Sequence, residues 1–327
     1  MDDTLILATE TGVVIAKPDG VDWRAARRGL HDQRATSVIA RAGVIIAGTH
    51  KGLFRSPDFG ESWEAAHRGL TIPHIRWLAF HPGMADFSAA GTEPAGLFIS
   101  HNGGDSWQAR PEVEALRDHL GWWLPYSPEA GCVRGLAFHG RRGYAAVEVG
   151  GVLRSDDEGK SWSLAAGSDG LPKFVEPQPG FIHADVHSIE VHPSSPDLVF
   201  AATNAGLYRS RDGGASWEMI NLGGYTRAIR VDPADPDHII SGPARNVGSY
   251  GTIIETNDRG QTWSPMTAGL DAPWPDTMVE RFTPINASTL GAVLDNGEVF
   301  AADLRTRQWR RILESVPGVN ALTVMAA

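Results

Sequence analysis

The sequence predicts an all-β fold made of seven four-stranded antiparallel units, and three observations carry this prediction. First, seven tryptophans recur along the chain at intervals of 40 to 55 residues, a period typical of repeat architectures. Second, five of these tryptophans end a similar eight-residue phrase. Third, the 37 glycines and 21 prolines are spread along the chain, as expected for many short strands joined by turns.

The repeated phrase, called here the eight-residue turn, runs from a Ser or Thr to the tryptophan. Its five full copies occupy 56–63, 100–107, 155–162, 210–217 and 256–263, and two weaker copies end at Trp23 and Trp309. In each full copy we expect the Asp, or Asn102 in the second copy, to accept hydrogen bonds within the turn. A glycine at the same place in every copy supplies positive φ, and the tryptophan packs between neighbouring units.

Each unit is predicted to contain four strands, with the eight-residue turn between the third and the fourth. The clearest unit has its strands at 186–193, 197–203, 206–210 and 215–220. Equivalent units fall at 36–67, 75–109, 133–165, 226–265 and 277–312. Four-stranded units repeated around an axis are the blades of a β-propeller, so the sequence predicts a seven-bladed propeller.

The two ends of the chain are predicted to share the remaining blade. Residues 319–325 have the pattern of a first strand, and residues 4–9 and 12–16 have the pattern of a second and a third. Pairing these segments would close the ring and remove an open sheet edge. We therefore predict a single β-propeller domain over residues 1–327.

Composition excludes several functional classes. The chain carries a formal net charge of −10 and no run of Lys or Arg, so binding to nucleic acid is not expected. No stretch approaches 18 apolar residues, so no membrane-spanning helix is expected. The single cysteine, Cys132, excludes disulfides within the chain. The first residues carry acids where a secretory signal carries bases, so we expect a cytoplasmic protein. The sequence does not predict its oligomeric state.

The eight-residue turn resembles the Asp-box, or BNR repeat, and the resemblance covers essentially the whole chain. The repeat is shared by sialidases, sortilin-type receptors, photosystem II assembly factors and many uncharacterised bacterial proteins described as glycosyl hydrolase-like. The resemblance implies a ligand site at the central axis, but no single activity, because the fold carries unrelated functions. Sialidases also carry an F/Y-R-I-P phrase and usually six blades. This chain lacks the phrase, so a sialidase of that type is not expected.

The second residue of each first strand is predicted to lie at the rim of the axial opening. Aligning the units places Thr36, Arg76, Arg134, His187, Arg227, Met278 and Asn320 at this position. Converging arginines suit the binding of a carboxylate or phosphate. In the alternative interpretation, each arginine pairs with an acid of the next blade and joins the ring. The acids placed for this are Glu93, Glu148, Asp185 and Asp276.

Two long loops, 107–133 and 162–186, and an insertion at 243–250 surround the same face. Long loops in compact domains tend to be functional, and the first should begin with a short helix that has Pro111 in its first turn. Their aromatic residues, together with Trp274, form either a pocket wall or the loops' own core; those in the three segments are Trp122, Trp123, Tyr126, Phe181 and Tyr250. The predicted substrate-binding residues are Arg76, Arg134, Arg227, His183, Trp122, Trp123 and Arg245.

Glu148 and His187 are the predicted acid and base, because they meet beside the axis from neighbouring blades. Tyr250 supplies a hydroxyl. No cofactor is predicted, since the chain contains no recognised metal motif. Imidazole and carboxylate nevertheless suit several divalent ions, and a metal site is kept as the minor alternative.

Other reactive side chains are interpreted as structural. His81, His139 and His192 each precede Pro or Gly in a repeated turn, which indicates a role in that turn. Cys132 lies two residues before Arg134, and a cation favours a thiolate nucleophile. A small buried cysteine is the preferred interpretation.

The sequence supports two functional hypotheses. In the first, a sialidase-like propeller binds a small anionic or polar substrate over the axis, a sugar acid among them, and acts as a hydrolase or lyase. In the second, the propeller is a non-catalytic platform for a protein or peptide, like the assembly factors that share the repeat. The expected partner is a small anionic or carbohydrate-like molecule under the first hypothesis.

Overall fold

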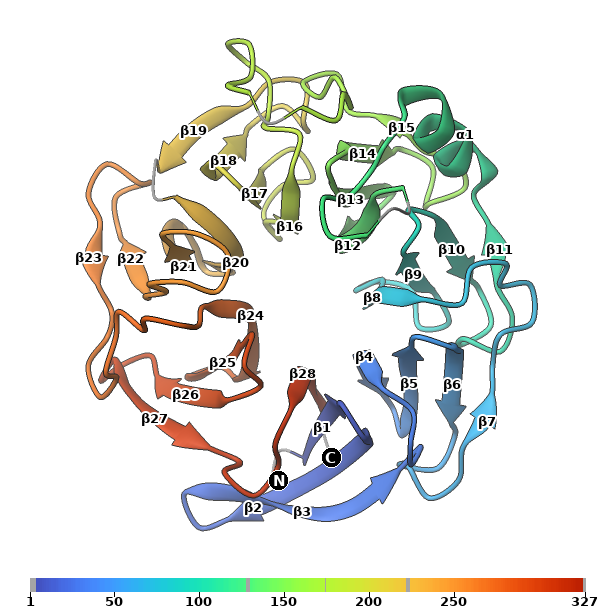
Figure 1. The fold of residues 1–327 in the computed structure, drawn as a ribbon, viewed down its shortest axis with the longest axis vertical. Coiled ribbons are helices and arrows are strands. Elements are labelled where there is room, and N and C mark those ends of the chain that lie inside the picture. The colour runs from blue at the N-terminus through green and yellow to red at the C-terminus, as the bar shows by residue number, and fades with distance from the viewer. Residues whose placement is uncertain (1–3, 128–129, 174, 222–223, 326–327) are drawn as a thin grey trace.

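The computed structural model describes residues 4–127, 130–173, 175–221 and 224–325. Within them, seven four-stranded antiparallel sheets stand side by side in one ring around a central axis (Figure 1). The predicted seven-bladed propeller is therefore confirmed. The other residues of the predicted domain 1–327 lie outside the described residues.

The first and second strands of the blades form the inner part of the ring. In blade order, the first strands are β28 (Val319–Met325), β4 (Ala35–Arg41), β8 (Ile75–Phe80), β12 (Cys132–His139), β16 (Val186–Val191), β20 (Tyr225–Asp232) and β24 (Val279–Asn286). The second strands are β1 (Thr4–Thr9), β5 (Val44–Thr49), β9 (Ser88–Thr92), β13 (Arg142–Glu148), β17 (Val199–Thr203), β21 (Asp235–Ala244) and β25 (Thr289–Leu294). The second strands are rich in Ala, Val and Ile because another blade packs on each of their faces.

The third and fourth strands lie farther from the axis. The third strands are β2 (Gly12–Asp19), β6 (Gly52–Ser56), β10 (Leu97–Ser100), β14 (Gly151–Ser155), β18 (Gly206–Ser210), β22 (Ile254–Thr256) and β26 (Val299–Asp303). The fourth strands are β3 (Asp22–Gly29), β7 (Glu64–Ala65), β11 (Gln108–Ala109), β15 (Ser163–Leu164), β19 (Glu218–Asn221), β23 (Ser264–Pro265) and β27 (Gln308–Ile312). Four of the fourth strands have only two residues, so the rim of the ring is made largely of turns.

The ring closes as the sequence predicts. Strand β28 pairs antiparallel with β1, with Val324 opposite Leu5 and Leu322 opposite Leu7. The first blade therefore has the order β28-β1-β2-β3 and joins both ends of the chain. This pairing covers the edge of β1 that would otherwise present unpaired backbone groups.

The hydrophobic core is divided among the interfaces between blades. The seven largest clusters of buried apolar side chains each join two neighbouring blades. Between the third and fourth blades, for example, Leu97 and Ile99 pack with Val133 and Val147. Each blade thus needs both neighbours to bury its two faces, which explains why the ring must be complete.

The eight-residue turn has the hydrogen bonding expected from its sequence. In the first copy, Asp58 accepts hydrogen bonds from the backbone N–H of Ser62 at 2.9 Å and from its hydroxyl, while Ser56 Oγ accepts from Gly60 N at 2.7 Å. The hydrogen bonds from Ser62 are the main reason that the pKa of Asp58 is lowered to about 2. Gly60 has a φ of 81°. The carboxylate of Asp58 therefore stabilises the turn.

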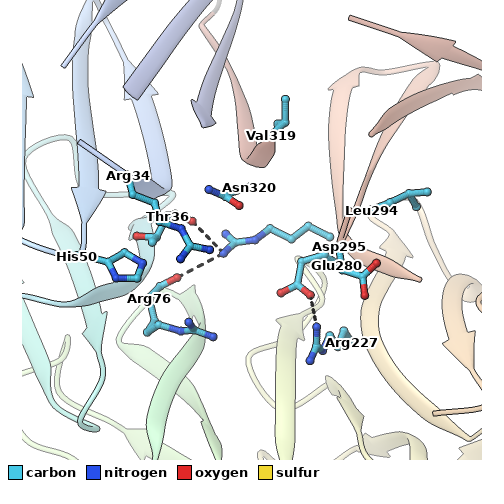
Figure 2. Close-up of a pocket in the computed structure, with 11 residues that line it drawn as sticks. Arg34, Thr36, His50, Arg76, Arg227, Glu280, Leu294, Asp295, Val319 and Asn320 are labelled. Carbon is cyan, nitrogen blue, oxygen red and sulfur yellow. Dashed lines mark hydrogen bonds and ion pairs between the residues drawn. The ribbon is translucent and has the colours of Figure 1, made fainter. Parts of the chain in front are cut away.

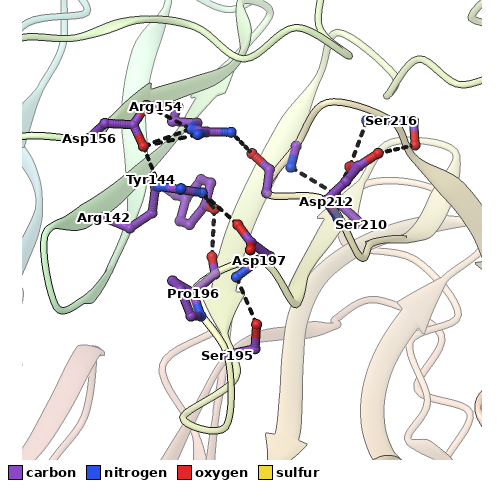
Figure 3. A network of polar contacts seen from close by, with 12 residues as sticks. Arg142, Tyr144, Arg154, Asp156, Ser195, Pro196, Asp197, Ser210, Asp212 and Ser216 are labelled. Atoms are coloured by element: carbon purple, nitrogen blue, oxygen red, sulfur yellow. Dashed lines mark hydrogen bonds and ion pairs between the residues drawn. The ribbon is translucent and has the colours of Figure 1, made fainter.

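Polar contacts also join neighbouring blades away from the axis, as Figure 3 shows for the fourth and fifth blades. Arg142 pairs with Asp156 of its own blade and with Asp197 of the next. The hydroxyl of Tyr144 donates to the carbonyl of Pro196 at 2.7 Å. These contacts anchor the turn before β17 against β13.

The only helix in the described part of the chain is α1 (Pro111–Leu120), at the start of the first long loop. Pro111 occupies its first turn as predicted, and Gly121 ends it with a φ of 68°, a left-handed conformation that glycine adopts readily. None of the described residues forms a helix long and apolar enough to cross a membrane.

Replacing Trp309 by alanine is expected to lower the free energy of unfolding by about 3–5 kcal/mol, the usual cost of removing a buried tryptophan. Trp309 is 1% exposed, and its Nε1 donates to Met266 O of the preceding blade at 2.9 Å. The matched control is Trp63→Ala, because Trp63 is only half-buried. Urea unfolding measures both variants. Equal losses would contradict the packing role assigned to the buried indole.

Candidate functional site

The first strand of every blade carries a β-bulge near its beginning, where one residue has no partner on the second strand. The bulged residues are Thr36, Arg76, Arg134, His187, Arg227, Glu280 and Asn320. A bulge turns its side chain out of the regular alternation of the strand. Several of these side chains meet at the axis, as Figure 2 shows for Thr36, Arg76, Arg227, Glu280 and Asn320.

The sequence alignment was wrong in the seventh blade, where it placed Met278 at this position. The strand register puts Val279 opposite Leu294 and Arg281 opposite Val293, which leaves Glu280 as the bulged residue. The carboxylate of Glu280 was therefore missed. The usable signal is the valine that precedes the polar residue, since Val279-Glu280 matches Val133-Arg134 in the fourth blade.

Glu280 joins two of the three predicted arginines across the ring. Its carboxylate accepts from Arg227 Nη1 at 2.7 Å and also forms a short contact with Arg134 Nη2. Burial raises the pKa of Glu280, but Arg227 and Arg134 outweigh burial and hold this pKa well below its ordinary value of 4.5. Glu280 is therefore ionised and stabilises two guanidinium groups.

The sequence also suggested that each axial arginine pairs with an acid of the next blade. The pairings of Arg134 and Arg76 agree with this interpretation only in part. Arg134 also donates to Glu148 at 3.1 Å, and Arg76 lies 3.4 Å from Glu93. In both cases the acid lies at the end of the second strand of the same blade, instead of on the next blade as expected. The link between blades is supplied by Glu280.

Arg281, the residue after the bulge, reaches across the axis from the seventh blade. Its Nη2 donates to the carbonyl oxygens of Thr36 at 3.3 Å and of Arg76 at 3.4 Å, and Figure 2 shows both acceptors opposite Glu280. The guanidinium also lies over the ring of Trp77, 4.1 Å from its centroid. The Nε atom is buried and makes no hydrogen bond within the described residues.

The positive charge of Arg281 is only partly compensated by its surroundings. Burial is the main cause that lowers the pKa of Arg281 to about 9, and the nearby Arg134 and Arg76 lower this pKa further, while Glu280 opposes them. A cation in such a place is incompletely compensated. An anion bound beside it would supply the missing charge.

A cavity of about 200 Å³ opens at this end of the axis. It is lined by Arg34, Thr36, His50, Arg76, Arg227, Glu280, Arg281, Leu294, Asp295, Val319 and Asn320. The lining contains four arginines and two carboxylates, an excess of two positive charges in a protein whose net charge is −10. His50 adds no further charge near neutral pH, because burial first, and then Arg34 and Arg76, lower its pKa.

The structure separates the other predicted site residues from this cavity. Trp122 is buried in the core between the third and fourth blades, and its Nε1 donates to Gly170 O at 2.7 Å. It is part of the loops' own core, so its expected place in a pocket wall is wrong. Trp123 is 42% exposed. Arg245 lies over the exposed ring of Tyr250, 5.5 Å from its centroid, and neither residue lines the cavity.

Glu148 and His187 do lie close together, as predicted, but they lie behind Arg134 and do not line the cavity. Both are buried, and His183 near them is also buried. Burial raises the pKa of Glu148, but Arg134 outweighs burial, so the pKa of Glu148 is below its ordinary value. Glu148 is thus held as a carboxylate, which disfavours the predicted role as an acid.

Cys132 and the three histidines of the repeated turns have the structural roles that the sequence suggested. Burial is the main cause that raises the pKa of Cys132, and Glu148, which accepts from its Sγ at 3.1 Å, raises it further. Cys132 is therefore a buried thiol. The rings of His81, His139 and His192 each contact a backbone carbonyl of the next blade, at 2.7 to 3.0 Å, which fixes the turns they occupy.

Comparison with known proteins places the chain among glycosidase-related propellers without defining one family. No family model matches the sequence. The chain is 26% identical over 192 residues to a xyloglucanase of Hypocrea jecorina (strain QM6a), covering 53% of this chain and 21% of that protein. It is 22% identical over 246 residues to a sialidase of Bacteroides fragilis (strain YCH46), covering 72% and 40% respectively. The chain thus spans less than half the length of either relative.

Solved structures share the fold. An ancestral GH74 enzyme superposes with a TM-score of 0.63 at 19% identity, over 94% of this chain and 40% of that one. YCF48 bound to D1 peptide superposes with a TM-score of 0.58 at 15% identity, over 90% and 87%. The class shown is therefore a seven-bladed β-propeller. Its structural neighbours include both glycoside hydrolases and a peptide-binding propeller.

Replacing Glu280 by glutamine is expected to lower the free energy of unfolding by about 3 kcal/mol, because two buried guanidiniums lose their shared anion. The pKa of Glu280 is depressed in the folded state, so its contribution is complete above the ordinary value of 4.5 and declines as the pH falls below it. Urea unfolding of wild type and E280Q should therefore give a constant difference near neutral pH and a smaller one in acid.

The control for E280Q is Asp295→Asn, which changes the other carboxylate of the cavity lining. Asp295 bonds only neutral groups, the hydroxyl of Thr277 and the backbone N–H of Met278, so we expect a loss of about 1 kcal/mol. A loss for E280Q no larger than that for D295N, or one that grows in acid, would contradict the ionic role of Glu280.

Proposed function

We propose that this protein binds a small organic carboxylate in the axial cavity, with a sugar acid as the expected class of ligand. The observation that carries the proposal is the Arg281 guanidinium. It contacts two carbonyl oxygens and an indole ring, and no carboxylate of the described residues lies within ion-pairing distance of it. A planar guanidinium is well suited to a carboxylate.

The size of the cavity supports recognition of a charged group and a short stem. Its volume of about 200 Å³ is below the range of about 300–1,000 Å³ typical of sites for drug-sized molecules. A larger ligand would therefore place only its anionic end in the cavity. Arg76 and Arg227 would then flank that end.

Binding is favoured over hydrolysis at this site. A hydrolase needs a group that can donate a proton, whereas Glu280 is held ionised between two arginines. The predicted acid–base pair of Glu148 and His187 does not line the cavity. Similarity to a xyloglucanase and a sialidase keeps hydrolysis of an anionic glycoside as an alternative activity.

A peptide platform is the second candidate function. The likeness to YCF48 bound to D1 peptide extends over 87% of that chain, whereas the likeness to the ancestral GH74 enzyme extends over 40%. A peptide carboxyl terminus has the same charged group as a sugar acid. The two candidate ligands therefore differ in the group attached to the carboxylate, not in how the arginines hold it.

Replacing Arg281 by methionine is expected to weaken carboxylate binding by about 2 kcal/mol, which is roughly 30-fold in Kd. Methionine keeps an apolar stem over Trp77 while it removes the charge. Calorimetric titration with glucuronate, with glucose as the neutral analogue, measures the effect. Arg245→Met is the matched control, since Arg245 lies outside the cavity lining, and it should bind glucuronate like the wild type.

Two results would count against the small-carboxylate proposal. Equal affinity of wild type and R281M for glucuronate would show that Arg281 does not bind the ligand. Equal affinity of the wild type for glucose and glucuronate would show that the negative charge is not recognised. Binding of a peptide with a free carboxyl terminus, but not of its amide or of glucuronate, would favour the platform. Turnover of an aryl glucuronide by the wild type would favour the hydrolase.

A further inference from the structure

A second polar cluster lies between the fourth and fifth blades, separate from the axial cavity. Glu148 at the end of β13, Asp185 before β16 and His187 in β16 each offer one ligand atom, and these three atoms lie within 4.8 Å of one another. The exposed fractions of the residues are 3%, 4% and 1%. Groups so deeply buried need specific partners, because buried charges are costly when unpaired, and Arg134 supplies such a partner only for Glu148.

The hydrogen bond at one nitrogen of His187 determines what the other nitrogen presents. Nδ1 lies 2.7 Å from the carbonyl oxygen of Thr226, so Nδ1 carries the proton and donates. In the neutral ring, Nε2 then presents its lone pair. Nε2 lies 3.2 Å from Asp185 Oδ1, and neither of these two buried atoms makes a hydrogen bond within the described residues. In the neutral form a lone pair and a carboxylate oxygen thus face each other, and either a proton on Nε2 or a metal cation between the two atoms would join them.

The spacing between His187 and Asp185 suits two ligands of one ion. A charge-assisted N–H···O bond is usually about 2.7–2.9 Å long. Two ligands bound about 2.1 Å from a tetrahedral ion lie roughly 3.4 Å apart. The observed 3.2 Å between Nε2 and Oδ1 is nearer the second value.

Contacts behind the three residues orient them toward a common point. The Nδ1–H of His187 is held by a backbone carbonyl, as is usual for a metal-binding histidine. Asp185 Oδ2 accepts from Asn204 Nδ2 at 3.2 Å. Glu148 Oε2 accepts from Arg134 Nη1 and from the Cys132 thiol, both at 3.1 Å. In each carboxylate one oxygen is occupied, which leaves the other for an ion.

Another histidine with two carboxylates provides a contrast within the same chain. His238 Nδ1 lies 3.3 Å from Asp232, and its Nε2 lies 3.3 Å from Glu255. The two acids flank the ring from opposite nitrogens, so these atoms do not converge. A ring flanked in this way forms ion pairs, whereas His187, Glu148 and Asp185 each offer one ligand atom within 4.8 Å of the others.

We propose that Glu148, Asp185 and His187 bind one divalent first-row transition metal ion, of the Zn²⁺ or Mn²⁺ type, between the fourth and fifth blades. One imidazole with two carboxylates matches the ligand preferences of these ions. Their charge of +2 neutralises the two carboxylates. Because the residues are buried and come from two blades, the ion joins the blades as a structural element. This site uses none of the residues that line the axial cavity.

The test uses the full chain after treatment with a chelator. Zn²⁺, Mn²⁺ or Co²⁺ is added to the wild type and to Asp185→Asn, His187→Gln and the control His238→Gln. Calorimetry gives the stoichiometry, the shift in Tm reports stabilisation by the bound ion, and the visible absorption of Co²⁺ reports its coordination. We expect one ion per wild-type chain, unchanged binding by H238Q, and a loss of affinity of at least about 100-fold in D185N and H187Q.

Each result decides the proposal. Binding of one ion that H238Q retains and D185N loses supports it. Absence of binding to the chelator-treated wild type, or binding that D185N and H187Q retain, overturns it and assigns the cluster to a protonated His187 paired with Asp185. If the variants do not fold, the Co²⁺ spectrum of the wild type decides alone, because nitrogen and oxygen ligands of a dry site give a spectrum distinct from that of the aqueous ion.

Discussion

The bulge at the start of each innermost strand is the constraint on which the axial site depends. In a regular strand, alternate side chains lie over the two faces of the blade, where they would pack against neighbouring blades. The bulge releases one side chain per blade and allows it to approach the axis. Because the blades are arranged in a ring, residues far apart in sequence, such as Arg134 and Glu280, come into direct contact. The ring closure between β28 and β1 keeps these distances fixed.

The balance of charges then determines whether each region near the axis favours an anion or a cation. Arg134 and Arg227 share Glu280, and they are satisfied within the protein. Within the described residues Arg281 makes its hydrogen bonds and its ring contact with neutral groups, and Glu280 compensates its charge only in part, so the opening of the axis favours an anion. The cluster of Glu148, Asp185 and His187 has the opposite polarity and favours a cation. Arg134 contacts both Glu148 and Glu280, and it therefore separates the two regions while it neutralises part of each.

The sequence was sufficient to predict the architecture, because the repeated turns and tryptophans mark where the strands of each blade begin and end. The turn that contains Asp58, the tryptophan spacing and the strand at 319–325 each predicted a structural element that is present. The axial side chains were predicted in six blades. In the seventh, the alignment reached Met278 in place of Glu280, because it did not use the valine that precedes the bulged residue in both Val133-Arg134 and Val279-Glu280. Pairing between blades could not be predicted either: Arg281 crosses the axis, and Glu148 lies near His187, only because the blades are held in a closed ring.

The most direct test of this account is a double-mutant cycle between Arg227 and Glu280, measured by urea unfolding of the wild type, R227M, E280Q and the double variant. Residues that share an ion pair at the axis should couple by about 1.5–3 kcal/mol, whereas independent sites add within about 0.5 kcal/mol. A coupling of at least about 1.5 kcal/mol is the result predicted here. Additive losses would mean that the bulged side chains do not meet, and the axial site would have to be abandoned.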